Sequence, residues 1–365
     1  MARTLTILVF VTAVAIGYAG WWTQSLSVLW YRISTSLVAL KALYSLPQEH
    51  VEAFLKSYDL FEQEHVTGKN NEAQHTVNYY QVVNHLCAVG EVEKMYIPPV
   101  LDSTAGVFGN QMLWEEKGMA DKLDIGPNSR VLDVGCGRGR VAHHMATYTG
   151  AKVTGLNIDP GQIKMAKEYA ESTDLLGKQL NFVQGNYNDP FPFEDESFDA
   201  IYQVQVLTYA IDLTAVFREW YRVLKPGSKV SSLDWMMLDK YNPDDPHHKD
   251  LLSKVKPVLG AVWTPKPQEF VDAFEKAGFQ VLFSGEASSE GGRQGPLIGK
   301  AKVFFEPLHA VIKFFVKVGL IPKHFDTLFE RLTRYGEAFV EADELGLFTT
   351  SWQIIAQKPF SKVKA

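Results

Sequence analysis

A short apolar run that ends in a glycine-rich loop constrains the fold of this chain most. Residues 130–134 (RVLDV) are mostly apolar, and Gly135, Gly137 and Gly139 follow them within one loop. Buried strands often stop in this way, and glycines allow both a tight turn and the close approach of a ligand to the backbone. A helical stretch follows at residues 141–148. This segment therefore predicts a strand, a loop and a helix, with a ligand at the loop.

The alternation of strand and helix continues along the chain. Further strand-like runs lie at residues 152–156, 180–184, 198–202 and 229–233, and helical stretches lie at 160–172 and 213–224. Strands that alternate with helices predict a parallel, doubly wound sheet. Ligands of such sheets bind beyond the carboxyl ends of the strands, so the glycine loop lies where a ligand is expected.

The spacing of the glycines separates two classes of nucleotide-binding protein. The dinucleotide fingerprint requires a further glycine at position 140, where this chain has Arg140. A nicotinamide-dependent dehydrogenase is therefore the least favoured enzyme class. The sequence VLDVGCGRG at residues 131–139 instead resembles motif I of the class I S-adenosylmethionine-dependent methyltransferases. The resemblance implies S-adenosyl-L-methionine as cofactor and S-adenosyl-L-homocysteine as product.

This resemblance also implies roles for individual residues. The loop backbone would face the amino-acid part of the cofactor, with Asp133 hydrogen-bonded near the same group. Asn157 stands where most such enzymes have an acid that binds both ribose hydroxyls, and an amide can also bind a diol because it donates and accepts. Asn186 and Tyr187 would lie beside the adenine. The residues implied for the cofactor are Asp133, Gly135, Cys136, Gly137, Gly139, Asn157, Ile158, Gln162, Asn186, Tyr187 and Gln203.

Two longer segments resemble the sterol 24-C-methyltransferases more specifically. These are LDWMMLDKYNPDDPHH at residues 233–248 and EAFVEADELGLFTTSWQIIAQKP at residues 337–359. VTGLN at 153–157 carries the asparagine typical of that family. The resemblance covers roughly residues 111–359. It implies a Rossmann-like, seven-stranded, mostly parallel sheet with helices on both faces and a C-terminal α+β cap, and an enzyme that methylates carbon of a sterol or related isoprenoid lipid.

The sequence departs from that family where the acceptor should bind. The family's aromatic, glycine-containing segment ahead of motif I is missing, and Gln205 and Tyr209 replace an acid and a histidine after the fourth strand. The base that removes a proton after methyl transfer therefore stays open, with Tyr209, Gln205 and Glu115 as the catalytic candidates. Further candidate bases are Glu116, Asp234 and His247. Aromatic side chains that could stabilise a carbocation are Trp114, Tyr187, Tyr202, Tyr209 and Trp235.

The N-terminus carries a membrane signal. Residues 4–31 contain no charged side chain, and the almost entirely apolar part at 5–22 ends in Trp21 and Trp22. As a helix this part would span about 27 Å, close to the hydrocarbon core of a bilayer. The sequence predicts a single transmembrane anchor at residues 1–31, and a cleaved signal peptide is the alternative. We expect the endoplasmic reticulum membrane, with the catalytic domain in the cytosol.

Two amphipathic stretches add to this expectation. Leucines recur at helical spacing up to Leu43, and residues 300–323 form a basic element with Phe304, Leu308, Val311, Ile312 and Phe315 on one face. Each stretch fits either a membrane surface or packing on the body of the protein. The predicted organisation is an anchor (1–31), a helical lead-in that forms part of the acceptor pocket (32–124), a cofactor domain (125–245) and the C-terminal domain (246–365).

Composition excludes several other classes. The chain has 36 basic and 42 acidic residues, a net charge of −6, which argues against a nucleic-acid binder. Its two cysteines exclude a disulfide scaffold and a cysteine-rich zinc module, and no metal is expected. The remaining alternatives are a methyltransferase for a phospholipid head group, a quinone or a small molecule, and a non-catalytic S-adenosylmethionine- or lipid-binding protein. The oligomeric state stays open.

Overall fold

The computed structural model describes residues 37–68, 72–89, 92–289 and 293–360, and the side chains of 300–304 are outside this description. The chain groups into two compact units. The first comprises the described part of Met1–Tyr58 with Gln74–Met95 and Lys300–Arg334, and the second comprises Asp59–Ala73, Tyr96–Gly299 and Tyr335–Ala365. The domain boundaries predicted from sequence stay a prediction, because compactness does not show which segments fold independently.

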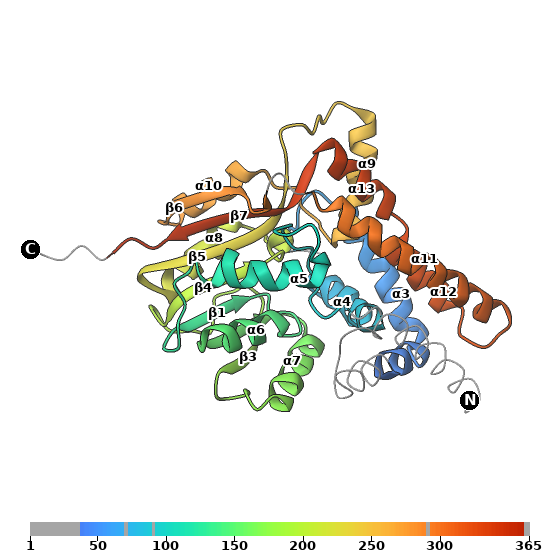
Figure 1. Cartoon of the computed structure of the whole chain (residues 1–365), viewed down its shortest axis with the longest axis horizontal. Helices are drawn as coiled ribbons and strands as arrows, with labels where there is room; N and C mark the ends of the chain where they lie inside the picture. Colours follow the sequence, from blue (N-terminus) through green and yellow to red (C-terminus); the bar gives the residue numbers. More distant parts are fainter. Residues whose placement is uncertain (1–36, 69–71, 90–91, 290–292, 361–365) are drawn as a thin grey trace, which may run out of the picture. The chain divides into compact units, whose positions relative to one another are not determined.

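A seven-stranded sheet organises the second unit, and Figure 1 shows its strands. The strands are β1 (Arg130–Val134), β2 (Lys152–Asn157), β3 (Leu180–Gln184), β4 (Phe198–Val204), β5 (Leu224–Met237), β6 (Gln280–Glu286) and β7 (Phe348–Gln357). Their order is β3-β2-β1-β4-β5-β7-β6, and β7 runs antiparallel to both of its neighbours while β1 to β5 pair in parallel. The five predicted strands and the mostly parallel sheet are confirmed.

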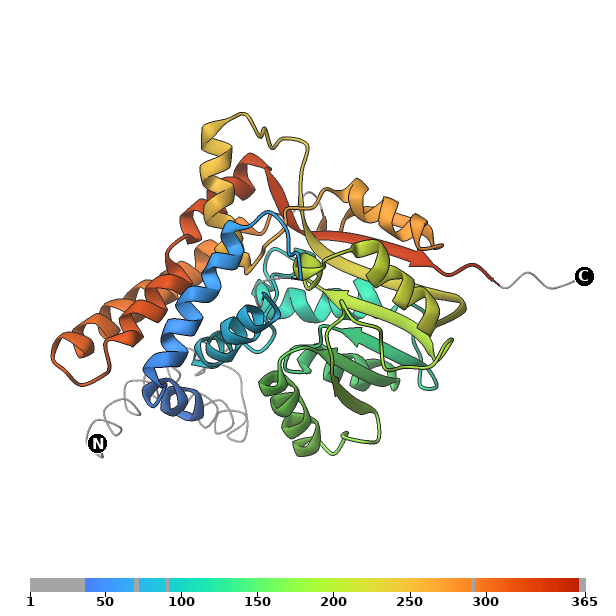
Figure 2. The same cartoon turned by 180° about the vertical axis from the view of Figure 1, so that it is seen from behind.

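Helices cover both faces of this sheet because its strands are apolar on both sides. On β1, Val131 belongs to a core with α6 (Arg140–Thr149) and α7 (Pro160–Ser172), whereas Leu132 belongs to a core with α8 (Leu213–Val223) and α10 (Pro267–Lys276). The second core is aromatic, with the rings of Phe217 and Phe274 stacked at 3.8 Å. Figure 2 shows these helices from behind. Burial on both faces is what a doubly wound sheet requires.

The C-terminal region completes the central sheet, which corrects the expected separate α+β cap. Its strands β6 and β7 extend the sheet beyond β5, so among the described residues of this region only helices remain for a cap. Two of them, α9 (Pro246–Leu259) and α13 (Gly336–Leu345), belong to a third core. Trp235, Phe339 and Phe348 pack there, which fixes the end of β5 against the start of β7. The antiparallel β7 brings its own beginning to the carboxyl edge of the parallel strands.

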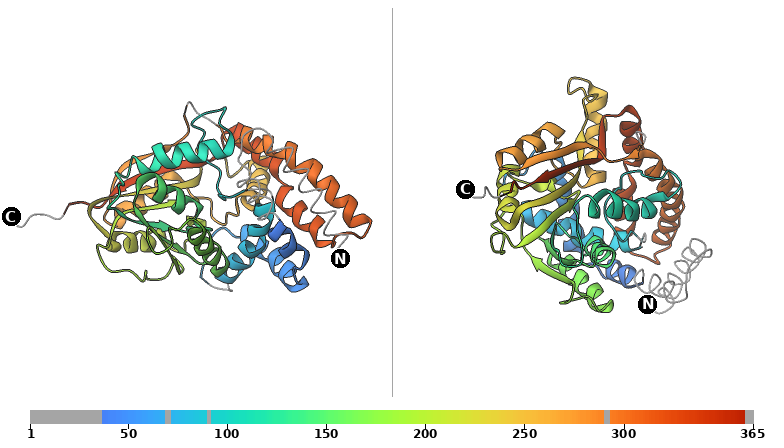
Figure 3. Two further views of the ribbon diagram at one scale, coloured as in Figure 1. Left: turned by 60° about the horizontal axis from the view of Figure 1, so that its bottom comes forward. Right: turned by 60° about the vertical axis from the view of Figure 1, so that its left-hand side comes forward.

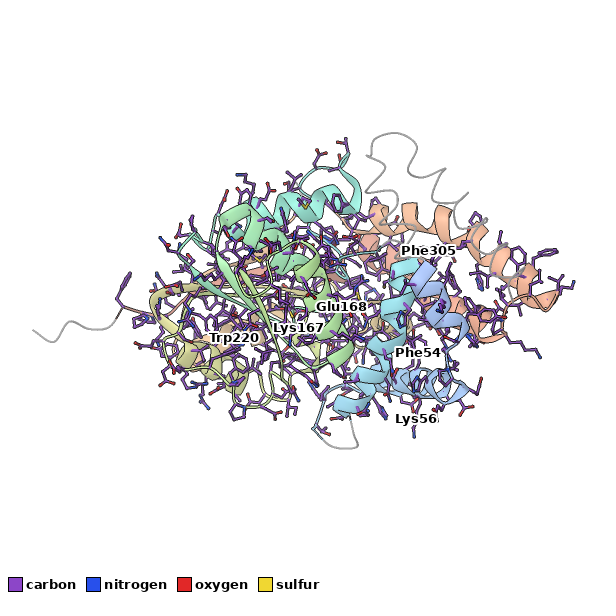
Figure 4. The ribbon with its side chains drawn as sticks, turned by 90° about the horizontal axis from the view of Figure 1, so that it is seen from below. Phe54, Lys56, Lys167, Glu168, Trp220 and Phe305 are labelled. Carbon is purple, nitrogen blue, oxygen red and sulfur yellow. The ribbon has the colours of Figure 1, made fainter. Side chains whose placement is uncertain are left out.

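The first unit is helical. It contains a helix at residues 37–44, α3 (Gln48–Ser57), α4 (Glu72–Val89, most of it in this unit), α12 (His324–Thr333) and the part of α11 (Gly295–Lys317) from residue 300 onward. Figure 3 shows α11 and α12 side by side. Figure 4 labels Phe54 of α3, which is fully buried here, and Trp220 of α8, which is fully buried in the second unit.

The described residues include only part of the segments predicted to contact a membrane. No helix among the described residues is both long and apolar enough to cross a bilayer. The predicted anchor at residues 1–31 lies outside the described residues. Of the amphipathic stretch that ends at Leu43, the described part packs inward, because Leu40 and Leu43 are buried.

Candidate active site

The glycine loop after β1 has a backbone that other residues would not adopt. Gly135, Gly137 and Gly139 have φ angles of 76°, 52° and 71°, all in the left-handed region. A Cβ at Gly135 would lie 2.3 Å from Val206, and one at Gly139 would lie 2.7 Å from Phe182. At Gly137 the nearest atom would be an amide nitrogen 4.0 Å away. Packing thus demands the outer glycines, while the middle one leaves the backbone open to a ligand.

The end of β2 holds this loop in place. The carbonyl of Leu156 accepts the N–H groups of Gly135 (2.7 Å) and Cys136 (3.1 Å). Cys136 is buried, and burial raises the pKa of its thiol well above the usual range. A Cβ on Gly155 would meet the Cys136 sulfur at 2.6 Å. Cys136 is therefore a small packing residue within the loop rather than a nucleophile.

Two amides face the loop from β2 and α7. Asn157 Nδ2 donates to Gln162 Oε1 at 2.7 Å, and Gln162 Nε2 lies 4.0 Å from the position that a Cβ on Gly137 would take. Asp159 caps α7 by accepting the Gly161 N–H at 2.8 Å, and the half-buried Ile158 lies between Asn157 and this cap. The structure therefore brings Asn157, Ile158 and Gln162 together at the glycine loop, where a group with both donors and acceptors can hold a ribose.

Asp133 is buried beside the loop. Tyr202 donates to its Oδ2 at 3.0 Å. Burial raises the pKa of Asp133 to about 8, although the hydrogen bond from Tyr202 lowers it. The carboxyl group is therefore protonated at neutral pH in the ligand-free protein. A cation placed next to it would favour the ionised form, which suits a site for an ammonium group.

The loop after β3 contacts the loop after β4. Asn186 Oδ1 accepts the Asn188 N–H at 3.0 Å, and Tyr187 donates its hydroxyl to the Val206 carbonyl at 3.0 Å. Asn188 Nδ2 donates to the Tyr209 carbonyl, also at 3.0 Å. These bonds fix Tyr187 across the carboxyl edge from the glycine loop.

Gln203 lies within the sheet rather than at its edge. Its Nε2 donates to Ser232 Oγ at 2.6 Å and to the Leu233 carbonyl at 3.1 Å, and its Oε1 accepts the Val206 N–H at 3.0 Å. Its side chain is fully buried. Gln203 therefore orders the turn after β4, and its contact with the cofactor stays a prediction.

Gln205 is the most unusual residue on the acceptor side. Its φ angle of 55° is left-handed, which a residue other than glycine adopts only at a cost. Its Nε2 donates to the carbonyls of Ile97 (2.6 Å) and Thr350 (2.7 Å), and its Oε1 accepts the Ile97 N–H (3.1 Å). A carboxylate could not replace it, because both carbonyls require a donor.

Through Gln205 the site includes residues 96–102, which we call the strap. Gln111 Nε2 donates to the Tyr96 carbonyl at 3.0 Å, and Asn110 Oδ1 accepts the Leu101 N–H at 2.6 Å. Ser288 Oγ accepts the Val100 N–H at 3.0 Å. The strap occupies the region of the family's missing aromatic segment, and side chains hold its backbone along its length. Sequence reasoning did not identify these side chains. The pair Pro98-Pro99 was the only local signal of an extended segment here.

Tyr209 ends the turn that Gln205 begins. Its hydroxyl donates to the Gly260 carbonyl at 2.5 Å, and Thr208 Oγ1 accepts the Val262 N–H at 2.8 Å. The hydroxyl of Tyr209 is thus directed at a backbone carbonyl. The catalytic roles of Tyr209 and Gln205 stay predictions, and their contacts are those of residues that position a turn.

Glu115 is the third catalytic candidate, and it has polar partners. It is fully buried in the helix η2 (Trp114–Ala120) and accepts the Tyr96 hydroxyl at 2.6 Å. His144 Nδ1 lies 2.6 Å from its other oxygen, and His144 Nε2 lies 3.1 Å from Glu116. Sequence reasoning missed Tyr96 and His144, which complete a buried Tyr–Glu–His cluster beside Asp133.

The remaining candidates are more dispersed. Trp114, Tyr202 and Trp235 are buried in hydrophobic cores. His247 is exposed and lies 2.8 Å from Glu341, so its role as a base has no support from its contacts. Asp234 is buried, accepts the Leu207 N–H at 3.0 Å, and its pKa is raised by burial to about 6.

Comparisons with known proteins agree with this geometry. A family model described as a methyltransferase domain matches residues 132–231. Among solved structures, the [4+2]-cyclase SpnF is similar in fold, with a TM-score of 0.62 and 20% identity over 82% of this chain and 99% of that one. A geranyl diphosphate methyltransferase solved with S-adenosylmethionine has a TM-score of 0.55 and 17% identity, over 72% of this chain and 98% of that one. The fold and the site thus define a class I S-adenosylmethionine-dependent methyltransferase.

Comparison with related sequences identifies the family of this chain. The chain is 32% identical to the sterol 24-C-methyltransferase erg6 of Aspergillus fumigatus over an alignment of 263 residues that covers 67% of this chain and 69% of the relative. It is 27% identical to the sterol 24-C-methyltransferase erg6 of Schizosaccharomyces pombe over 86% of this chain and 87% of the relative. The chain belongs to the sterol 24-C-methyltransferase family.

Proposed function

We propose that this enzyme methylates a carbon atom in the side chain of a sterol or a closely related isoprenoid lipid. One observation carries the proposal: the two segments that most resemble the family on the acceptor side pack against each other. Met236 on β5 pairs with Thr349 on β7, and Trp235 contacts Phe348 in the same core. The likeness to the family therefore extends beyond the cofactor half of the sheet.

The residues present fit the cofactor. The open backbone at Gly137 and the amide pair Asn157–Gln162 suit its amino-acid and ribose parts, and Asp133 suits its ammonium group. When bound, S-adenosylmethionine supplies an electrophilic methyl group on a sulfonium. An alkene is a weak nucleophile, so the protein must hold the acceptor in line with that methyl group. The strap and the turn at Gln205 provide a fixed wall for this purpose.

A proton must leave the acceptor after methylation, and we propose the Tyr96–Glu115–His144 cluster as its destination. Burial raises the pKa of Tyr96 well above its usual range, with the charge of Glu115 adding to the effect, so its hydroxyl stays a donor to Glu115. A proton taken up at the Tyr96 oxygen can be matched by transfer of its own proton to Glu115 Oε1. His144 lies within hydrogen-bond distance of the other oxygen and can stabilise the change of charge.

Membrane attachment through residues 1–31 is a second part of the proposal, with the catalytic part in the cytosol beside the endoplasmic reticulum. A lipid acceptor dissolves in the membrane, so an anchor keeps the enzyme next to its substrate. Alkaline extraction of membranes tests this: the full chain should stay with the membrane, and a chain without residues 1–31 should be released. Release of the full chain would contradict the anchor.

A methyl-transfer assay tests the acceptor. Purified enzyme, S-adenosylmethionine with a labelled methyl group and a panel of sterols in detergent micelles should give a labelled lipid heavier by one methylene group. Gln205 differs from the residue that the family has at this position. This difference favours one alternative, in which the acceptor is another lipid or a small molecule. Label in a phospholipid head group, a quinone or an aqueous amine, with none in a sterol, would establish that alternative and end the sterol proposal.

A further inference from the structure

The second half of α11 exposes an apolar stripe. Val311 and Phe314 of α11 and Val318, which follows its last residue, are all exposed, at intervals of three and four residues. The Val318 N–H still donates to the Phe314 carbonyl, so Val318 continues the helical spacing. Residues at these intervals lie on one face of a helix. Pro307 and Ala310, also exposed, extend the same face by one turn. The stripe therefore continues over three turns of the helix.

The part of the apolar surface next to this stripe is covered. Ile312 is buried and Phe315 is half-buried. His309 lies 2.7 Å from Asp326 of α12, which fixes the side of α11 that faces its neighbour. Val311 and Phe315 are four residues apart and share a face, as the sequence predicts, and Val311 lies at the exposed margin of that face. A surface helix ordinarily buries its apolar face, so the exposed part needs an explanation.

Positive charge surrounds the stripe. Lys313 and Lys317 are exposed along its edge, and Lys323 is exposed directly before α12. The sequence from residue 307 to residue 325 contains no acidic side chain. An apolar stripe with lysines on its flank complements a bilayer with anionic lipids, because long lysine side chains reach the head groups while the apolar residues enter the acyl boundary.

We propose that this face of α11 inserts into the surface of an anionic membrane, with Phe314 deepest and the lysines at the head groups. This contact is additional to the anchor at residues 1–31. It would orient α11 and α12 along the bilayer plane. The inference does not depend on which acceptor is methylated, so a failure of the sterol assay leaves it standing.

A fluorescent reporter on the stripe tests the proposal with the full chain. Phe314→Cys in a Cys87→Ser background, labelled with an environment-sensitive dye, reports on the stripe alone, because Cys136 is buried. Vesicles of phosphatidylcholine mixed equally with phosphatidylserine should shift its emission to the blue and raise its intensity. Spin-labelled lipids should then quench it. The matched control is Phe108→Cys in α5 (Gly106–Leu113), since Phe108 is 64% exposed and Phe314 is 60% exposed.

Charge reversal tests the role of the lysines. Lys313→Glu with Lys317→Glu should reduce the shift of the labelled protein several-fold on these vesicles. Lys164→Glu with Lys167→Glu on α7 should leave it unchanged, although the change in net charge is the same. A dye at Phe314 that stays in a watery environment while the protein sediments with vesicles would overturn the proposal.

Two results without lipid would also overturn it. A blue-shifted emission without vesicles that is the same at every protein concentration would mean that another part of the chain covers the stripe. An emission that shifts to the blue as the protein concentration rises would mean that a second copy of the chain covers the stripe.

Discussion

The glycine loop after β1 is ordered by its backbone, whereas the turn after β4 and the strap are ordered by single side chains. In the first region, left-handed glycines and close packing at Gly135 and Gly139 fix the shape. In the second, amide and hydroxyl groups such as those of Gln205 and Tyr209 bond to backbone carbonyls. A site for a constant cofactor can be built into the backbone. A site for a varied acceptor is more easily changed when individual side chains shape it.

The largest effect is expected in the glycine loop. Gly137→Arg should abolish binding of S-adenosylmethionine in calorimetry, because the side chain would occupy the open approach to the backbone. Gly177→Arg is the matched control, since Gly177 also has a left-handed φ of 74° and open space around its Cβ position. Both variants should lose ~1 kcal/mol of stability from backbone strain. Unchanged cofactor affinity in Gly137→Arg would mean that the cofactor lies elsewhere.

Gln205→Glu should lower stability and methyl transfer while it leaves cofactor binding nearly unchanged. The carboxylate cannot donate to the carbonyls of Ile97 and Thr350, so the free energy of unfolding should fall by ~2–3 kcal/mol in chemical denaturation. Methyl transfer should fall with it, while cofactor affinity changes by less than about twofold because the glycine loop is untouched. Gln184→Glu, at an exposed amide in the last position of β3, is the control. Equal stability of Gln205→Glu and the wild type would remove the positioning role.

The same contrast separates what the sequence could predict from what it could not. The five parallel strands and the glycine loop follow from patterns over a few neighbouring residues. The role of Gln205 depends on Ile97 and Thr350, which lie 108 and 145 residues away in the chain. In α11 the sequence shows which positions are apolar, but only the packing of α12 decides which of these side chains are covered.

Tyr209→Phe should have a smaller effect than Gln205→Glu. It leaves the Gly260 carbonyl without its donor, which should cost ~1–2 kcal/mol of stability. Tyr187→Phe removes a comparable bond to the Val206 carbonyl and is the control. If Tyr209 only positions the turn, kcat should change by less than about tenfold in both variants. A loss of a thousandfold in Tyr209→Phe alone would make its hydroxyl a participant in the chemistry.

The stability of the cofactor half should depend on pH. The pKa of Asp133 is raised from 3.8 to about 8, so the folded protein holds a proton that the unfolded chain has lost. The stabilisation from this group is therefore complete below pH 3.8 and is lost as the pH rises to about 8. Asp133→Asn should flatten this part of the stability curve, and the slope that remains should come from the other buried carboxyl groups whose pKa values are raised, Asp234, Glu286 and Asp343.

Cofactor binding should have the opposite dependence on pH. An ammonium group beside Asp133 favours the ionised carboxylate, so binding should release a proton, and the affinity should rise with pH by at most about tenfold per unit up to about pH 8. Calorimetry in buffers of different ionisation enthalpy counts that proton. Release in the wild type and none in Asp133→Asn would place the ammonium group at Asp133. Equal release in both would assign the proton to another group and would separate Asp133 from the cofactor half of the site.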